Sequence, residues 1–485
     1  MALLIMAKRP SKPLSKLELT LAEFFKAHHK HGAPLLLAFS GGPDSLSLLH
    51  LLMRQRKKLF DLHLAHIDHG WREESAREAQ QLKEMAERLN LPFHLKTLSP
   101  QDLEGNLEAS SREARLCFFQ ELYAECHFQA VLFAHHADDQ AETVLTRLFE
   151  GASLPHLGGM KQVTRMGALK ECLEIWRPLL THPKQDLLTY LEESSLKEPL
   201  LVPIQDRTNV DPRFRRARMR TQLFPQLATA FGKKIGENLC RLGNMLSDVA
   251  TYLDERILPY WSAVYKGVAG VLVDVIAIQG LHPLELQHFL RRFCEREGVC
   301  PSREVMEMLS QLLISGVSNR WAPIWDQEFH IDRGRLFLLH KEVSKEIRAL
   351  PSVELELSDA AVQYGHWRVT VTATSTANLQ SITSQPTTNW LDLWQGLARV
   401  TLPAGDYTLG APVPGSLYPR SHQLTRWWTN HKIPSFLGQY APVVWSGGRI
   451  CHEFLTGKVT LPPSTNNITL ELRYILLVAE NGNLD

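Results

Sequence analysis

The 485-residue chain contains no apolar run of the roughly 20 residues that a helix needs to span a bilayer. Its seven cysteines are scattered without a Cys-x-x-Cys pair, which argues against a thiolate metal site and against a disulfide framework. At the N-terminus the apolar residues precede the basic ones, which is the reverse of a secretory signal peptide. These absences predict a cytoplasmic protein with reduced thiols and no membrane partner.

The length is too great for one hydrophobic core and predicts several domains. The pattern is mostly helical from about residue 222 and becomes strand-like, with Gly and Pro turns, from residue 350 onward. We therefore expect an α/β domain at 1–225, a mainly helical domain at 226–345 and a small β-rich domain at 346–485.

Strand-like and helix-like segments alternate between residues 34 and 195. The expected strands are 34–39, 60–67, 93–98, 130–136 and 172–180, and the expected helices are 44–57, 73–90, 106–125 and 138–149. This alternation predicts right-handed βαβ units and a doubly wound parallel sheet with helices on both faces. Because such sheets bind ligands at the carboxyl ends of their strands, the segments after the first and fourth strands are candidate sites.

The first strand ends in the loop Ser-Gly-Gly-Pro-Asp-Ser, which leads directly into a helix. Glycines let the backbone turn its amides inward, and a helix N-terminus attracts phosphate through unpaired N–H groups and its dipole. The serines add hydroxyl donors, and Asp44 can hold the magnesium that accompanies a nucleotide. With nothing bound, the same loop is a strand-to-helix turn with Asp44 as N-cap. The nucleotide-binding candidates are Ser40, Gly41, Gly42, Pro43, Asp44 and Ser45.

A second polar cluster, His-His-Ala-Asp-Asp-Gln-Ala-Glu-Thr, follows the fourth strand. At helical spacing His135, Asp139 and Glu142 can share one face, and Asp138 forms an i, i+4 pair with Glu142. Three acids within five residues suit a site for a cation, either Mg²⁺ or the ammonium of an amine. The alternatives are acids that only complement the helix dipole, or a weaker His/Asp zinc site.

Arginines form two further candidates for binding phosphate. Arg112 and Arg115 lie three apart on one expected helix, where they either neutralise charge at a reacting phosphate or form a solvated face. Residues 207–220 hold six arginines against one acid, Asp211, which is typical either of a phosphate-backbone patch or of a solvated linker.

Together these segments resemble the N-type ATP pyrophosphatases, which cleave ATP between the α and β phosphates and transfer AMP to a substrate oxygen. Within that superfamily the chain is similar to the tRNA(Ile)-lysidine synthetases. The segments that carry this further resemblance are HIDHGWREES (66–75), NLEASSREARLCFF (106–119), AHHADDQAET (134–143), RPLL (177–180) and DRTNVDPRFRRARMR (206–220). Several positions depart from the family pattern; for example, Glu150 stands where arginine is usual and Ala217 where asparagine is usual.

The resemblance implies a PP-loop ATPase domain followed by two tRNA-binding domains, with ATP and Mg²⁺ as cofactors. It implies that free L-lysine is joined to the C2 position of the wobble cytidine of tRNA(Ile) with a CAU anticodon, through adenylation of that base. A homodimer is expected from the family alone.

The resemblance also implies roles for the candidate residues. Asp44 and Asp138 would hold Mg²⁺, while Asp139 and Glu142 would position or deprotonate the lysine ammonium. The residues that would support the nucleotide and its adenylate are Arg112, Arg115 and His135. The residues that would contact RNA are Arg213, Arg215, Arg216 and Arg220.

The main alternative is a tRNA thiolase of the same superfamily. Sulfur transfer needs a reactive cysteine or Cys-x-x-Cys cluster ligands, whereas Cys117 and Cys126 lie within an expected helix and no such pair exists. A non-catalytic RNA-binding protein with an inherited nucleotide fold is an alternative of another class. The consumption of ATP would distinguish an enzyme from it.

Overall fold

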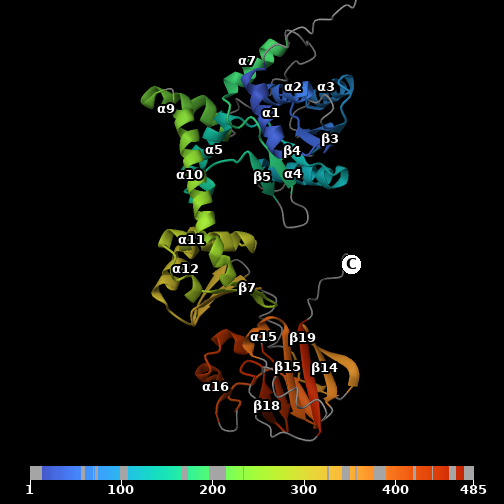
Figure 1. The fold of residues 1–485 in the computed structure, drawn as a ribbon, viewed down its shortest axis with the longest axis vertical. Coiled ribbons are helices and arrows are strands. Elements are labelled where there is room, and N and C mark those ends of the chain that lie inside the picture. Colours follow the sequence, from blue (N-terminus) through green and yellow to red (C-terminus); the bar gives the residue numbers. More distant parts are fainter. Residues whose placement is uncertain are drawn as a thin grey trace, which may run out of the picture. The chain divides into compact units, whose positions relative to one another are not determined.

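The computed structural model divides into two compact units, Met1–Thr251 and Tyr252–Asp485 (Figure 1). The structure describes residues 14–55, 60–68, 70, 75–98, 107–166, 173–195, 215–232, 234–324, 327–340, 350–355, 358–374, 389–418, 422–439, 441–457 and 466–474. Among these residues, no helix has the length and apolar character that crossing a membrane requires. The three-domain division at 225 and 345 is finer than these two units and stays a prediction.

The first unit is built on a six-stranded sheet of order β3-β2-β1-β4-β6-β5. Its strands are β1 (Leu35–Ala38), β2 (Leu62–Asp68), β3 (Phe93–Thr97), β4 (Ala130–Leu132), β5 (Val163–Met166) and β6 (Leu173–Trp176). All neighbouring pairs are parallel except β5 with β6. The doubly wound parallel sheet is therefore confirmed, and β5 is an antiparallel edge strand that the sequence pattern did not predict.

Helices cover both faces of this sheet. The helices of the first unit are α1 (Lys16–His28), α2 (Pro43–Gln55), α3 (Ser75–Arg88), α4 (Leu107–Cys126), α5 (Ala137–Phe149), α6 (Leu154–Leu157), α7 (Lys184–Ser195), α8 (Arg215–Arg218), the π-helical turn η3 (Met219–Leu223), α9 (Phe224–Phe231) and α10 (Ile235–Ile257, which continues into the second unit). Leu35 and Leu37 of β1 join the core with α1, α2, α3 and α7, whereas Leu36 joins the core with α4. Successive side chains of a strand point to opposite faces, so this strand is apolar throughout.

The second unit begins with a helical layer on an antiparallel sheet. Helices α11 (Pro283–Arg296) and α12 (Arg303–Ser315) share a core with one face of a five-stranded sheet, order β7-β8-β11-β10-β9. Its strands are β7 (Val264–Gly267), β8 (Gly270–Asp274), β9 (Arg320–Ile324), β10 (Gln327–Asp332) and β11 (Arg335–Leu339). The mainly helical expectation for this stretch missed these strands. Both faces of β8 are buried, so its apolar run lacks the alternation by which a strand is recognised.

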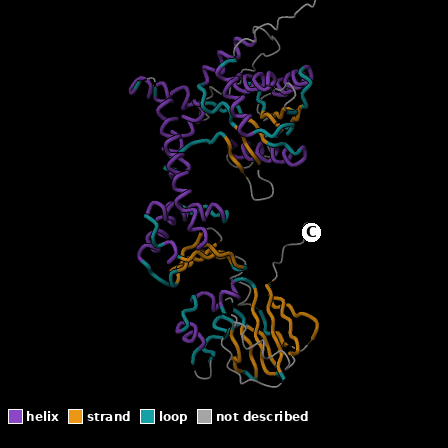
Figure 2. Tube along the Cα trace, in the orientation of Figure 1, coloured by secondary structure: helices purple, strands orange, loops and turns teal. Residues whose placement is uncertain are grey.

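The C-terminal part is β-rich, as expected. Two four-stranded antiparallel sheets have the orders β12-β16-β17-β18 and β13-β14-β19-β15 (strands orange in Figure 2). The strands are β12 (Val353–Leu355), β13 (Ser358–Tyr364), β14 (Trp367–Thr374), β15 (Leu397–Pro403), β16 (Tyr407–Gly410), β17 (Val443–Ser446), β18 (Arg449–Glu453) and β19 (Asn467–Tyr474). One large apolar cluster joins these sheets to Leu272 and Phe337 on the other face of the preceding sheet.

Candidate active site

The strand order places the two polar loops side by side. Strand β1 lies between β2 and β4, so the chain leaves β1 toward one side of the sheet and later returns to the other. In doubly wound sheets a ligand binds at such a switch point, beyond the carboxyl ends of the strands. The loop that leads from β1 into α2 and the segment that leads from β4 into α5 are the two segments at this point.

The 40–45 loop is shaped as a turn that opens onto the first turn of α2. Gly41 has φ +76°, a left-handed conformation that favours glycine. The backbone N–H of Gly42 donates to Ser40 Oγ at 3.4 Å, and Ser45 Oγ donates to the Gly42 carbonyl at 3.0 Å. Pro43 is the first residue of α2, where its missing N–H costs the helix no hydrogen bond. The loop therefore places its hydroxyls at a helix N-terminus suited to an anion.

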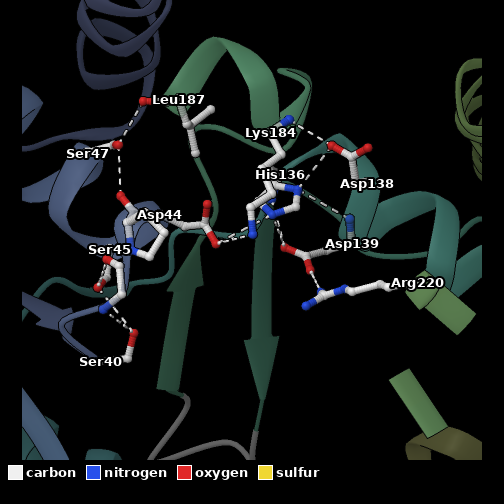
Figure 3. A network of polar contacts seen from close by, with 12 residues as sticks. Ser40, Asp44, Ser45, Ser47, His136, Asp138, Asp139, Lys184, Leu187 and Arg220 are labelled. Atoms are coloured by element: carbon white, nitrogen blue, oxygen red, sulfur yellow. Dashed lines mark hydrogen bonds and ion pairs between the residues drawn. The ribbon is translucent and has the colours of Figure 1, made fainter. Parts of the chain in front are cut away.

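Asp44 lies between this loop and two cations. Its Oδ2 is 3.4 Å from Lys184 Nζ and 3.7 Å from His136 Nε2 (Figure 3). Burial alone would raise the pKa of Asp44, but His136 and Lys184 together lower it, so the carboxylate is ionised. The second oxygen, Oδ1, is buried and has no hydrogen-bond partner among the described residues. A buried carboxylate oxygen left in this state is suited to an added cation.

His136 is the centre of the network. It is the N-cap of α5, only 1% exposed, and its ring nitrogens lie 3.3 Å from Asp139 Oδ2 and 3.5 Å from Asp138 Oδ2. Burial alone would lower the pKa of His136, yet Asp138, Asp44 and Asp139 raise it to about 9. His136 is therefore an imidazolium at neutral pH. The sequence reasoning did not select it.

Lys184 was also not selected from the sequence. It opens α7 after β6, and its backbone N–H donates to Asp138 Oδ2 at 2.7 Å while its ammonium faces Asp44. The hydrogen bond from His136 and this backbone N–H hold the pKa of Asp138 at about 2. The one available signal was its place just after a strand end in the predicted parallel sheet.

Arg220 joins the acids from the other side. From η3, its Nη2 donates to Asp139 Oδ1 at 2.7 Å and to Glu142 Oε2 at 3.1 Å, and its Nε donates to Glu142 Oε1. Burial raises the pKa of Glu142 although Arg220 opposes that shift. Arg220 was predicted to contact RNA, and the structure places it within the acid cluster. Arg215 and Arg216 are exposed on α8, where Arg215 forms an ion pair with Glu150.

The remaining predicted residues lie outside this network as described. The Nδ1 of His135 accepts a hydrogen bond from Arg177 Nε at 3.2 Å, and its ring stacks on Phe133. Burial and the nearby arginines keep the pKa of His135 well below 6.5, so its ring is neutral. Arg115 is half-buried on α4. The side chain of Arg112 and all of Arg213 lie outside the described part of the structure.

A cavity of about 920 Å³ opens beside the acids, entirely within the first unit. Residues of the network that line it are His136, Asp138, Glu142, Lys184 and Arg220. The network as a whole has four carboxylates (Asp44, Asp138, Asp139 and Glu142) against three cations (His136, Lys184 and Arg220), which leaves one net negative charge. That balance favours an added cation, and the adjacent helix N-terminus favours a phosphate.

Comparisons with known proteins agree with this geometry. The model of the PP-loop domain ATP_bind_3 matches residues 13–227. The tRNA(Ile)-lysidine synthase of Protochlamydia amoebophila is 35% identical over 458 residues, which cover 93% of this chain and 96% of that relative. The enzyme of the same name from Chlamydia muridarum is 40% identical over 243 residues, covering 50% of this chain and 72% of that relative.

A solved structure of a U34-tRNA thiolase from Methanococcus maripaludis, with its 4Fe-4S cluster, is 16% identical with a TM-score of 0.39. It covers 48% of this chain and 78% of its own, a likeness too slight to bear on the reaction. The long match to the Protochlamydia amoebophila protein, over nearly the whole of both chains, is decisive by contrast. This chain belongs to the tRNA(Ile)-lysidine synthase family.

Proposed function

We propose that this protein ligates free lysine to C2 of the wobble cytidine in a tRNA(Ile) with a CAU anticodon, converting ATP to AMP and diphosphate. The observation that carries the proposal is the position of His136, which contacts Asp44 beside the nucleotide loop and the acid pair Asp138 and Asp139 on α5. The proposed adenylation site and the proposed amine site would thereby belong to one network.

In the first step the C2 oxygen of cytidine attacks the α-phosphorus of ATP, and the bond from that phosphorus to the bridging oxygen breaks. Diphosphate leaves with the bonding electrons. The N-terminus of α2 and the hydroxyls of Ser40 and Ser45 would hold the departing phosphates. Lys184 and the imidazolium of His136 supply positive charge beside them, which stabilises the charge that develops.

The donor set also fits the Mg²⁺ that accompanies ATP. Asp44 Oδ1 is buried without a hydrogen bond among the described residues, and the Asp138 carboxylate is partly exposed nearby. Carboxylate oxygens are the ligands that Mg²⁺ prefers, so Asp44 and Asp138 would hold it. When bound, the ion would neutralise phosphate charge and orient the α-phosphate.

In the second step the ε-amine of lysine attacks C2, and AMP leaves with the oxygen that it activated. The ammonium must first lose a proton. Asp139 and Glu142 are buried acids that both accept hydrogen bonds from Arg220. Burial raises the pKa of Glu142, so this carboxylate is more basic than that of an ordinary glutamate. These two residues would bind the ammonium, and Glu142 would accept the proton.

The exposed arginines of α8 would contact the RNA backbone. Arg215 and Arg216 are both exposed and lie four to five residues before Arg220, which is fixed in the acid cluster. Phosphate contacts of this kind position RNA without reading its sequence. Arg213 is proposed to extend the same patch.

Cys240 argues against sulfur transfer at this site. It lines the cavity, its Sγ donates to the Ala137 carbonyl at 3.1 Å, and burial raises its pKa to about 11. A thiol with that pKa is almost fully protonated at neutral pH, whereas sulfur chemistry needs the thiolate.

The test is transfer of labelled lysine to acid-precipitable RNA in the presence of ATP and Mg²⁺. We expect incorporation into tRNA(Ile) with a CAU anticodon and not into tRNA(Met), which shares that anticodon. If neither tRNA is labelled while diphosphate is still released, the protein adenylates its substrate but does not use lysine as the nucleophile.

A further inference from the structure

Helix α10 packs against α5 through small residues. The Cys240 thiol contacts the Ala137 carbonyl, a Cβ on Gly236 would meet Ala141 Cβ at 3.9 Å, and one on Gly243 would meet Val144 Cγ2 at 2.8 Å. Residues at i, i+4 and i+7 share one face of a helix. This face of α10 is therefore fixed against the helix that carries the catalytic acids.

The neighbouring face of α10 lines the cavity. Glu237, Arg241 and Asn244 repeat the same spacing one residue further along, and all three are exposed and border the 920 Å³ cavity. Because the packed face is held in place, these three side chains are directed into the space that Glu142 and Arg220 border from α5 and η3.

An apolar surface completes the lining. Phe224, Pro225 and Ala228 of α9 and Ile235 of α10 border the same cavity. The cavity thus suits an amino acid with a long cationic side chain. The acid cluster matches the side-chain ammonium, and the apolar wall matches the methylene stem. The cation of α10 matches the α-carboxylate, and the acid and the amide beside it match the α-amine.

We propose that Arg241 binds the α-carboxylate of the free amino-acid substrate, and that Glu237 and Asn244 accept hydrogen bonds from its α-ammonium. This inference rests on the proposed function, because it takes lysine as the amine. It assigns the selection of a free amino acid over a simple amine to α10, whereas the acids of α5 recognise only the reacting ammonium.

An RNA phosphate is the competing ligand for Arg241. Glu237 lies one turn before Arg241 on the same face, and its carboxylate would repel a phosphate bound there. A zwitterionic end group satisfies both charges at once. The observed pair of opposite charges therefore favours an amino acid over RNA.

The test compares lysine with 1,5-diaminopentane, which has the same amine and methylene chain but no carboxylate. For the wild type we expect a far lower KM for lysine than for 1,5-diaminopentane. Arg241→Gln should raise the KM for lysine about 10- to 100-fold, the range for a lost hydrogen bond to a charged group. The kcat, the KM for ATP and the KM for 1,5-diaminopentane should stay unchanged. The variant should therefore lose most of its preference for lysine over 1,5-diaminopentane.

Lys234→Gln is the matched control, because Lys234 is an exposed cation beside the start of α10 and does not border the cavity. It should leave the preference intact, and Arg241→Lys should restore part of it. Equal use of both amines by the wild type would overturn the proposal even if Arg241→Gln failed to fold. A raised KM for tRNA with an unchanged KM for lysine would also overturn it, in favour of an RNA contact. Absence of lysine transfer by the wild type would instead contradict the proposed function itself.

Discussion

The guanidinium of Arg220 donates a hydrogen bond of 2.7 Å to Asp139 Oδ1, joining the turn η3 to the first turn of α5. The contact spans 81 residues of sequence. It ties the arginine-rich stretch, whose exposed members are proposed to contact RNA, directly to the acids that are proposed to hold lysine. A tRNA that engages α8 would thus act on residues adjacent to the reaction centre.

Replacing Asp139 by Asn should abolish lysine transfer, with a loss of about 10²-fold or more, since a neutral amide neither holds an ammonium nor offsets Arg220. Diphosphate release that depends on tRNA should persist at a reduced rate, because Asp44 and the 40–45 loop are untouched. Labelled-lysine incorporation and diphosphate release measure the two steps separately. The control is Asp248→Asn, an exposed acid of α10 outside the cavity. Full lysine transfer by Asp139→Asn would refute the assignment.

The buried imidazolium of His136 should make stability fall as the pH rises above neutrality. Its pKa is raised from 6.5 to about 9, so its contribution is fully present below pH 6.5 and is lost as the pH rises through 9. The difference between these two pKa values corresponds to about 3 kcal/mol of unfolding free energy. The lowered pKa values of Asp44 and Asp138 act only in acid, outside this window.

The measurement is the denaturation midpoint of the wild type and of His136→Gln between pH 6 and 10. His136→Gln should be less stable at pH 6 and should show a flatter dependence across the window, because the other titrating groups are common to both proteins. Parallel curves would mean that His136 is not the charged group.

Arg216→Gln should weaken tRNA binding and reduce the slope of log affinity against log salt by about 1, as expected when one phosphate contact is lost. The KM for lysine should change much less than tRNA binding, because Arg216 is exposed on α8 and does not border the cavity, although its charge also acts on Glu142. Filter binding over a range of salt concentrations measures the slope. An unaltered slope would show that α8 does not contact the RNA backbone.

Replacing Gly159, in the loop after α5, should destabilise the protein. The Gln140 side chain holds this loop in a clamp of three hydrogen bonds. Its amide donates to the Gly158 and Met160 carbonyls at 3.1 Å and accepts from the Met160 N–H at 2.7 Å. Gly159 has φ +78°, and a Cβ there would lie 2.6 Å from the Gln140 amide. Gly159→Ala should therefore cost about 2 kcal/mol, through backbone strain and the displaced clamp.

The matched control is Gly151→Ala, which has φ +67° but open space around the added Cβ. It should cost only the backbone strain of about 1 kcal/mol. Urea denaturation compares the two variants. Equal losses would show that the clamp by Gln140 contributes nothing beyond backbone conformation.

Cys240→Ala should retain lysine transfer within about threefold, because the thiol is a packing group and a protonated donor. The same assay as for Asp139→Asn measures it. Loss of lysine transfer in a folded Cys240→Ala protein would show instead that the thiol takes part in the reaction.

Local sequence was sufficient for the parallel strands of the first sheet and for the 40–45 loop. The apolar run at 34–39 followed by two glycines and a helix predicted β1 and α2 to within two residues, and the acids of 138–142 were placed on α5. These are short-range patterns, in which neighbouring residues fix the strand, the turn and the helix that follows. Strands β7 to β11 of the second unit were missed, and in β8 burial on both faces removes that short-range signal.

By itself, the sequence determined which functional groups are present: a glycine-containing loop before a helix, a group of acids and a cluster of arginines. Their order along the chain resembles that of one family. Only the tertiary structure decided which cations meet the acids. Lys184 reaches Asp44 across 140 residues because α7 packs against α2, and Arg220 reaches Asp139 because η3 lies beside α5. His136 rather than His135 enters the network, because the N-cap position of α5 directs its ring toward three carboxylates while its neighbour points to Arg177. Contacts of this kind depend on strand order and helix packing, which bring distant residues together and leave no local pattern in the chain.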